Sequence, residues 1–202
     1  DEGYLTDTRT AIAGAIASKY LSNKDANSVG IIGAGIQARL QLKAILLVRK
    51  INKINVWARD KVKVNQFADS LKDLKIDINI SESCKDLASV SDIIITTTPS
   101  KKPLLEFDWI KKGTHITAVG SDTHEKCELD SKILAKADLV VADSLEQNLL
   151  RGEIHQALKK ECIAENKIVE IGEIFNRSQP GRTASSQISV ADLTGVAVQD
   201  LV

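Results

Sequence analysis

The sequence lacks several features that mark common protein classes. None of its 202 residues is methionine, only three are cysteine, and only 3% are aromatic. Cys84, Cys127 and Cys162 are widely spaced and form no C-x-x-C pair, so we expect neither a disulfide framework nor a metal site, and a reducing cytoplasm as the location. The scarcity of aromatic residues argues against a platform for stacked nucleic-acid bases.

Charge of one sign and long apolar runs are missing as well. Lys and Arg total 27, as do Asp and Glu, so the formal net charge is zero and no basic excess attracts a phosphate backbone. No apolar run approaches the roughly 20 residues that span a bilayer. We therefore expect neither nucleic acid nor a membrane as a partner.

The chain begins Asp-Glu-Gly-Tyr, without an initiating methionine. We expect it to be incomplete at its N-terminus, with a cut at the C-terminus as a further alternative, so that any substrate groups from missing segments are not visible in this sequence. Its 43% of hydrophobic residues is enough to bury the core of one domain, or of one domain and a fragment of another.

Hydrophobic periodicity predicts a leading helix and then an α/β alternation. Small and apolar residues recur at helical spacing over residues 5–22, with Thr6 or Asp7 as the expected N-cap. We expect strands over residues 29–32, 54–57, 76–80, 92–96, 114–120, 139–142 and 168–171, and helices over 37–50, 62–74, 84–90 and 132–137. Short, continuously apolar strands separated by helices indicate an α/β fold: a Rossmann-type, doubly wound, mostly parallel sheet with helices on both faces.

A glycine motif follows the first of these strands. Gly33, Gly35 and Ala38 occupy the three positions of a G-x-G-x-x-A fingerprint. Gly33 permits the tight turn, Gly35 lets the backbone approach a pyrophosphate, and Ala38 allows close packing of helix on strand. The phosphates would rest on the amide groups at the helix N-terminus. An ordinary glycine-rich turn is the alternative interpretation.

The end of the second strand distinguishes NADP from NAD. A carboxylate there binds the ribose 2′-hydroxyl and repels a 2′-phosphate. Here Ala58 takes the position that is usually acidic, and the Arg59 guanidinium can meet a 2′-phosphate. A shift of one residue would place the Asp60 carboxylate there instead. We expect NADP(H) to be preferred, with NAD(H) as the alternative.

Threonines follow the fourth strand. Thr97 and Thr98 would lie at the carboxyl ends of the strands, where ligands bind in this fold, and could donate hydrogen bonds to the cofactor ribose. Turn formation explains them nearly as well.

Five motifs, in the right order, resemble the ornithine cyclodeaminase/μ-crystallin family. They are Leu-Thr-Asp-Thr-Arg-Thr-Ala (5–11), Gly-Ala-Gly-Ile-Gln-Ala-Arg-Leu-Gln (33–41), and the segments 118–130, 143–153 and 194–200. The resemblance implies an NAD(P)-dependent dehydrogenase, ketimine reductase or cyclodeaminase, usually a homodimer. It also implies a substrate and dimerisation region built from both chain ends, which we expect to be largely missing here.

The resemblance also divides the chain. Residues 1–22 would lead in from the substrate and dimerisation region as a helix. Residues 23–190 would form the NAD(P)-binding Rossmann domain, and residues 191–202 would begin the helix that returns to that region.

The resemblance implies roles for particular residues. Arg9 matches the arginine that holds the substrate carboxylate, for which a planar fork is well suited. Asp122 matches the catalytic acid/base, which exchanges a proton with an imine or amine nitrogen. Pairing of Arg9 with a nearby carboxylate, and capping of the next turn by Asp122, are the alternatives. Expected cofactor contacts are Ile36 and Gln37 at the phosphates, Val119 near the nicotinamide, and Thr194.

The expected function is reduction of a cyclic imino acid. Δ1-Pyrroline-2-carboxylate or Δ1-piperideine-2-carboxylate would give L-proline or L-pipecolate, in proline metabolism, because the Ala58–Arg59 pair favours a reductase over an NAD-using cyclodeaminase. Thr123–Glu125 replace a Pro-Gly that the family often has, which leaves the substrate open. Ornithine cyclodeaminase and a non-enzymatic, NADPH-binding crystallin-like protein are the alternatives. His115, His124 and His155 lack metal-ligand spacing, and His115 is expected to be structural.

Overall fold

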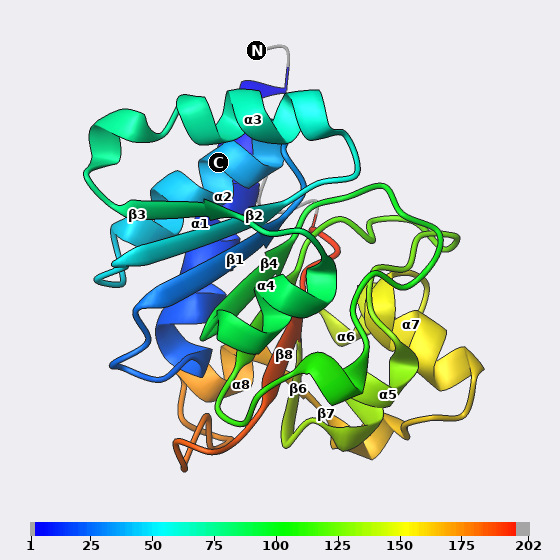
Figure 1. The fold of residues 1–202 in the computed structure, drawn as a ribbon. Helices are drawn as coiled ribbons and strands as arrows, with labels where there is room; N and C mark the ends of the chain where they lie inside the picture. Colours follow the sequence, from blue (N-terminus) through cyan, green and yellow to red (C-terminus); the bar gives the residue numbers. More distant parts are fainter. Residues whose placement is uncertain (1–2, 197–202) are drawn as a thin grey trace.

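The computed structural model describes residues 3–196 and shows one sheet with helices on both sides (Figure 1). All paired neighbours run parallel, in the order β3-β2-β1-β4-β5-β8-β6-β7. The strands are β1 (Ser28–Ile32), β2 (Lys53–Trp57), β3 (Asp77–Ile80), β4 (Ile93–Thr96), β5 (His115–Ala118), β6 (Leu139–Ala142), β7 (Ile168–Glu170) and β8 (Ser189–Asp192). The expected Rossmann-type fold is confirmed.

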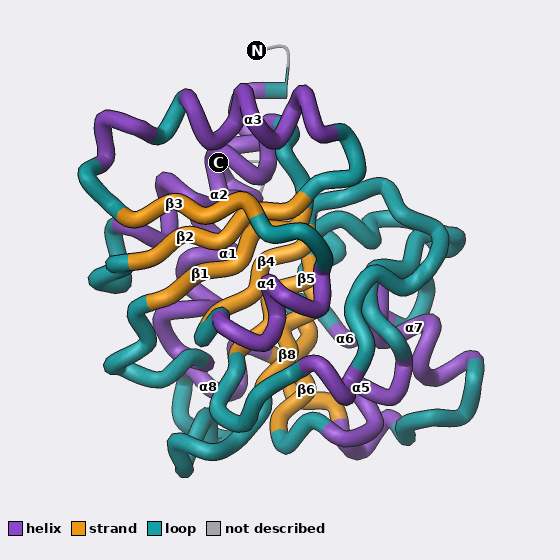
Figure 2. The backbone as a smooth tube through the Cα atoms, in the orientation of Figure 1, coloured by secondary structure: helices purple, strands orange, loops and turns teal. Residues whose placement is uncertain are grey.

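The helices form two layers, which Figure 2 shows on either side of the strands. One layer holds α1 (Tyr4–Leu21), α2 (Ile36–Leu46), α3 (Lys61–Asp69) and α8 (Ile171–Phe175), and the other holds α4 (Cys84–Val90), α5 (Ser131–Lys136) and α7 (Gly152–Lys159). The short α6 (Leu145–Asn148) precedes α7. Three 3-10 turns are η1 (Lys72–Leu74), η2 (Phe107–Trp109) and η3 (Glu165–Lys167). Within residues 3–196, none of the helices combines the length and apolar character needed to cross a bilayer.

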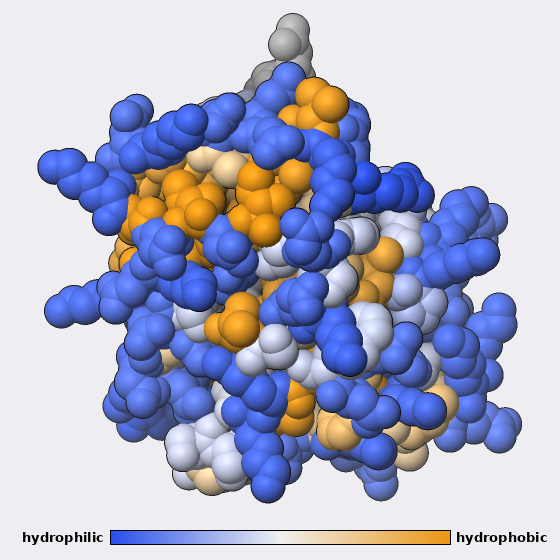
Figure 3. All heavy atoms as spheres, in the orientation of Figure 1, coloured by the Kyte–Doolittle hydropathy of each residue, from blue (hydrophilic) through white to orange (hydrophobic). Residues whose placement is uncertain are grey.

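The sheet is buried on both faces, which explains its continuously apolar strands. Every residue of β1, β4, β5, β6 and β8 is buried. Ile31 belongs to the hydrophobic cluster on the α1–α2 side, and the next residue, Ile32, to the cluster on the α4–α5 side. Each fully buried isoleucine contributes about 1.5–3 kcal/mol relative to an exposed one. Figure 3 shows further apolar side chains gathered beneath α3, over β2 and β3.

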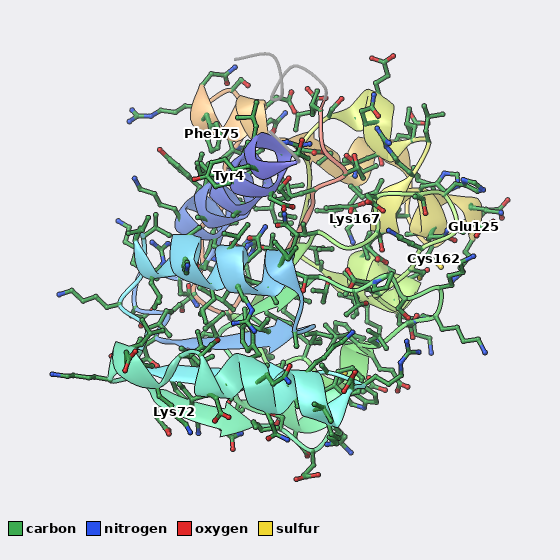
Figure 4. All side chains as sticks on the ribbon, turned by 90° about the horizontal axis from the view of Figure 1, so that it is seen from above. Tyr4, Lys72, Glu125, Cys162, Lys167 and Phe175 are labelled. Atoms are coloured by element: carbon green, nitrogen blue, oxygen red, sulfur yellow. The ribbon has the colours of Figure 1, made fainter. Side chains whose placement is uncertain are left out.

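Helix α1 packs on the same face as α2 and contacts β5 and β8. Gly14 makes the close crossing possible, because a Cβ there would lie 2.0 Å from the Gln41 Oε1 atom of α2. Gln41 is buried and donates to the Thr10 carbonyl at 3.0 Å. At the other end of α1, the ring centroids of Tyr20 and Phe175 are 4.7 Å apart, and Figure 4 labels Phe175 on α8 beside this helix.

Several expected boundaries were wrong. Helix α1 starts at Tyr4 with Gly3 as its N-cap, so neither Thr6 nor Asp7 caps it; both already lie in its first turns. Helix α2 ends at Leu46 rather than Lys50, and the second expected helix splits into α3 and η1.

The C-terminal elements also differ from expectation. Helices α6, α7 and α8 and strand β8 were not expected at all. Because β8 ends at Asp192, residues 191 and 192 belong to the sheet and not to the returning helix expected from 191 onward. Residues 197–202 of that segment lie outside the described residues.

A buried polar chain links α1 to the centre of the sheet. His115 of β5 lies 2.9 Å from Ser189 Oγ through Nδ1 and 2.9 Å from Thr117 Oγ1 through Nε2. Ser189 Oγ donates to the carbonyl of Leu21 in α1 at 2.8 Å, so His115 Nδ1 is the donor to Ser189 and Nε2 accepts from Thr117. Burial lowers the pKa of His115 to about 3, with the nearby Arg182 and Arg49 guanidiniums adding to the effect. The expected structural role of this histidine is confirmed.

We expect His115 to make the stability of the protein depend on pH. The unfolded imidazole binds a proton near pH 6.5 and the folded one only near pH 3, so its contribution is complete above pH 6.5 and is lost as the pH falls. Urea unfolding of wild type and His115→Gln from pH 4 to pH 8 should give curves that differ in slope by up to about 1.4 kcal/mol per pH unit below pH 6.5. His124→Gln, at an exposed histidine, is the matched control. Parallel wild-type and His115→Gln curves would contradict this assignment.

Candidate cofactor and substrate site

The parallel strands bring their carboxyl ends to one edge, where β1 lies between β2 and β4. Between β3 and β4 the chain crosses from one half of the sheet to the other. Ligands of such sheets bind at the carboxyl ends of the strands, at the point where the strand order reverses. Gly33 has a φ of +123°, and a Cβ on it would lie 2.4 Å from Thr97 Oγ1. Only glycine fits this turn, which connects β1 to α2 and packs against Thr97 after β4.

Gly35 supplies open backbone at the start of α2. No described atom lies within 4 Å of the Cβ position at Gly35, and no side chain caps the helix. This leaves room for a pyrophosphate to approach the backbone at the start of α2, where the first-turn N–H groups have no acceptor within the helix. Ala38 is fully buried against the sheet, and Ile36 is 67% exposed. The geometry of this turn fits the expected dinucleotide.

A cavity of about 420 Å³ collects the predicted residues from distant parts of the chain. It combines the first half of α1, the start of α2, and the segments after β5 and β8. Its lining includes Arg9, Gln37, Val119, Asp122 and Thr194, together with Arg151. The structure thus places the expected substrate arginine, catalytic acid/base and three expected cofactor contacts around one space.

An adjoining cavity of about 210 Å³ is lined by Thr97 and Thr98 after β4. It shares Gln37, Val119 and Asp122 with the larger cavity, so the two are parts of one crevice. Arg59 lies elsewhere, exposed beyond the end of β2.

Gln37 ties the two N-terminal helices together at the rim of the crevice. Its Nε2 donates to Asp7 Oδ1 at 2.8 Å, so the start of α2 holds the first turn of α1. Arg9 follows Asp7 by two residues and lines the larger cavity. The contact explains why a helix upstream of the sheet contributes to a site at its carboxyl edge.

Asp122 has a cationic neighbour. Lys126 Nζ lies 2.5 Å from Asp122 Oδ1, and the aspartate side chain is 56% exposed. Ion pairs with this exposure are worth about 0–1 kcal/mol, so a ligand can displace the lysine at little cost. Lys126 lies in a motif of the resemblance but was given no role from sequence.

Glu128 is a buried carboxylate that sequence reasoning missed. It accepts hydrogen bonds from Thr98 N, Thr98 Oγ1 and Thr96 Oγ1, each at 2.6 Å, and from Gly120 N at 3.0 Å. These donors come from the last residue of β4 and from the loops after β4 and β5. Burial raises the pKa of Glu128 to about 7 even though the threonine hydrogen bonds act in the opposite direction. One carboxylate therefore holds together the two loops that line the smaller cavity.

Two further buried carboxylates, Glu153 and Asp192, also accept hydrogen bonds from backbone N–H groups. Glu153 of α7 accepts from Glu128 N at 2.6 Å and Leu129 N at 3.1 Å. Asp192 at the end of β8 accepts from Ile154 N at 2.8 Å. Burial raises the pKa of Glu153, and that of Asp192 well above its ordinary value. The signal in the sequence was an acidic residue flanked by apolar ones, which is rarely buried without partners.

The sequence model of the ornithine cyclodeaminase/mu-crystallin family matches residues 1–202. The chain belongs to this family. It spans 61–62% of the length of the curated relatives that it matches, among them an uncharacterized cyclodeaminase of Sinorhizobium fredii, 46% identical over 99% of this chain.

Solved structures agree closely with the fold. An archaeal alanine dehydrogenase dimer with bound NAD has a TM-score of 0.95 and 37% identity, covering 100% of this chain and 62% of that one. Thermococcus litoralis Δ1-pyrroline-2-carboxylate reductase, in complex with NADH and L-proline, has a TM-score of 0.92 and 36% identity, covering 98% and 62%. Paracoccus denitrificans iminosuccinate reductase, in complex with NAD+, has a TM-score of 0.93 and 34% identity, covering 98% and 61%.

We expect Glu128→Gln to loosen both strand-end loops. Glutamine keeps one acceptor oxygen but places an NH₂ donor against the N–H and O–H donors that Glu128 accepts from. The unsatisfied groups should lower the free energy of unfolding by about 1–3 kcal/mol. Urea unfolding at pH 8 should show that loss, and the amide hydrogens of Thr98 and Gly120 should exchange faster. Glu106→Gln, at an exposed carboxylate, should change neither. Unaltered exchange at both amides in Glu128→Gln would show that Glu128 does not hold these loops.

Proposed function

We propose that this protein is an NAD(P)H-dependent imino-acid reductase, with Δ1-pyrroline-2-carboxylate and Δ1-piperideine-2-carboxylate as the first candidate substrates. The observation that carries the proposal is that Asp122 and Arg9 line one cavity beside the open glycine turn. Similarity to the Thermococcus pyrroline-2-carboxylate reductase and the Paracoccus iminosuccinate reductase supports the same reaction class.

The backbone amides after Gly35 would hold the pyrophosphate, with Gln37 beside them. Thr97 and Thr98 would contact a ribose, and Val119 and Thr194 would border the nicotinamide. When bound, the reduced nicotinamide supplies a hydride to the imine carbon. The buried carboxylate of Glu128 keeps the loops after β4 and β5 in place for this binding.

Asp122 would hold or move the proton at the substrate nitrogen, while Arg9 pairs with the substrate carboxylate. In reduction the carbon–nitrogen double bond gains a hydride at carbon and a proton at nitrogen. If the imine binds in its protonated form, its N–H approaches the Asp122 carboxylate in place of the Lys126 ammonium, and the nitrogen keeps that proton after hydride transfer to carbon.

The end of β2 supports NADP(H) as the preferred cofactor. The Asp60 carboxylate caps α3 by accepting from Val62 N at 3.0 Å and Lys63 N at 3.1 Å, so it is engaged away from the ribose position. Ala58 is buried, and Arg59 is exposed directly beyond it. NAD(H), which the similar solved structures contain, is the competing cofactor. We also propose a homodimer, as in the similar alanine dehydrogenase.

We expect Asp122→Asn to reduce the turnover number by about 100-fold or more, because general acid–base catalysis typically contributes 10²–10⁴-fold. The affinity for NADPH, measured by fluorescence titration, should stay near the wild-type value. Turnover is followed by the loss of NADPH absorbance with Δ1-pyrroline-2-carboxylate. Asp108→Asn, at an exposed aspartate, is the matched control.

An unchanged turnover number in Asp122→Asn would remove Asp122 from the mechanism. Release of proline and ammonia from ornithine, without net cofactor oxidation, would establish the cyclodeaminase alternative. Cofactor binding with neither activity would favour the crystallin-like binder.

We expect Arg59→Ala to weaken NADPH binding about tenfold or more and NADH binding much less. The reason is the loss of a charged hydrogen bond to the 2′-phosphate, worth about 1.5–3 kcal/mol. Titration of both cofactors against the variant and against Lys43→Ala, on the exposed side of α2, measures the difference. Equal losses for the two cofactors would refute the role of Arg59.

A further inference from the structure

A second arginine, Arg151, lines the larger cavity together with Arg9. Arg9 comes from α1, and Arg151 is the residue immediately before α7. Sequence reasoning gave Arg151 no role. Both guanidiniums share the cavity with Asp122, the proposed acid/base, so both can reach a ligand bound there.

The backbone holds Arg151 in place. The next residue, Gly152, has a φ of +94°, and a Cβ there would lie 2.5 Å from Asp192 Oδ2 and 2.6 Å from Thr194 Cγ2. The start of α7 is therefore pressed against the segment that follows β8. A side chain supported in this way is well placed to select a ligand.

The guanidinium of Arg151 is only partly satisfied. One terminal nitrogen, Nη2, donates to the neutral amide oxygen of Gln147. Its Nε is buried and has no hydrogen-bond partner among the described residues, and no described carboxylate forms an ion pair with it. A half-buried cation beside a neutral amide lacks the negative charge that usually compensates it.

The acidic residues of the cavity already have other partners. Asp7 accepts from Gln37 at 2.8 Å, and Asp122 pairs with Lys126 at 2.5 Å. Neither neutralises Arg151. The missing negative charge would therefore come from the ligand.

Both arginines are near the segment Thr194–Gly195, which also lines the cavity. A Cβ on Gly195 would be 3.1 Å from Arg9 Nη1, and Thr194 touches the Gly152 position beside Arg151. A ligand with two carboxylates in this cavity would have one guanidinium available for each, since Arg forks pair well with carboxylates.

We propose that Arg151 selects dicarboxylic substrates: an imino acid, and its amino acid, whose side chain ends in a second carboxylate. This inference rests on the proposed reductase function and places dicarboxylic imino acids ahead of the monocarboxylic cyclic imines as substrates. In the oxidative direction L-aspartate loses a hydride from its α-carbon to NAD(P)+ and a proton from its nitrogen, which leaves the imine. Arg9 holds the α-carboxylate and Arg151 the side-chain carboxylate.

The matched substrates are L-aspartate and L-alanine, which differ by one carboxylate. With the purified protein and NAD(P)+, wild type should have a higher kcat/KM for aspartate. Arg151→Gln should raise KM for aspartate about 10- to 100-fold, the loss expected for hydrogen bonds between charged groups, and leave KM for alanine within about twofold. Lys160→Gln, exposed at the far end of α7, should behave as wild type.

Binding of non-reacting acids gives a readout that does not depend on turnover. Succinate and butyrate have equal numbers of carbons but carry two carboxylates and one. Calorimetric titration in the presence of NADPH should show tighter binding of succinate to wild type and no such preference in Arg151→Gln. Equal binding of the two acids by wild type would overturn the inference. So would equal losses for aspartate, alanine and NADPH in Arg151→Gln, which would assign Arg151 to the cofactor.

The two proposals fail in different ways. If no amino or imino acid reacts but succinate binds through Arg151, the reductase function is wrong and the second carboxylate site stands. If Δ1-pyrroline-2-carboxylate is reduced and dicarboxylates are neither preferred nor bound, the function stands and the selectivity is wrong.

Discussion

Buried carboxylates that accept backbone N–H groups hold the carboxyl edge of this sheet together. The loops after β4 and β5 have amides that no neighbouring strand can satisfy, and Glu128 supplies the acceptor for both. Glu153 supplies acceptors for the chain around Glu128 itself, and Asp192 does so for α7. Because an unsatisfied buried amide costs about 1–3 kcal/mol, these contacts determine where the loops can lie.

The same edge receives an element from the start of the chain. Helix α1 lies on α2 through the Gly14–Gln41 crossing and the Gln37–Asp7 hydrogen bond. The turn that would hold a pyrophosphate and the helix that carries Arg9 are therefore packed as one unit. The proposed cofactor site at the start of α2 and the proposed substrate arginine on α1 are thus linked by direct helix–helix contacts.

Local sequence patterns were sufficient to predict the first half of the fold and the glycine turn. The β1–α2–β2 unit is predictable from the sequence because its strands are apolar, its helix is amphipathic, and Gly33 must adopt a conformation that other residues avoid. The roles of the residues that line the larger cavity were predicted from the family resemblance. Composition and periodicity alone do not indicate that Arg9 and Asp122 line the same cavity.

The parts that escaped prediction depend on tertiary context. Strand β8 reads Ser-Val-Ala-Asp, which has no apolar run, yet it is fully buried because it lies between β5 and β6 with a hydrophobic cluster on each face of the sheet. Helix α1 takes Gly3 as its cap where a side-chain oxygen was expected. The role of Glu128 could not be foreseen because its four donors come from residues 8–32 positions away.

The position of β8 has a consequence for how the protein forms during translation. Strand β8 is the last described strand along the chain, but it lies between β5 and β6. Until residues 189–192 have left the ribosome, the nascent chain can hold only two separate half-sheets, β3-β2-β1-β4-β5 and β6-β7. The open edge of β5 is exposed during that interval and is the point at which a nascent chain is most vulnerable to mispairing with another strand.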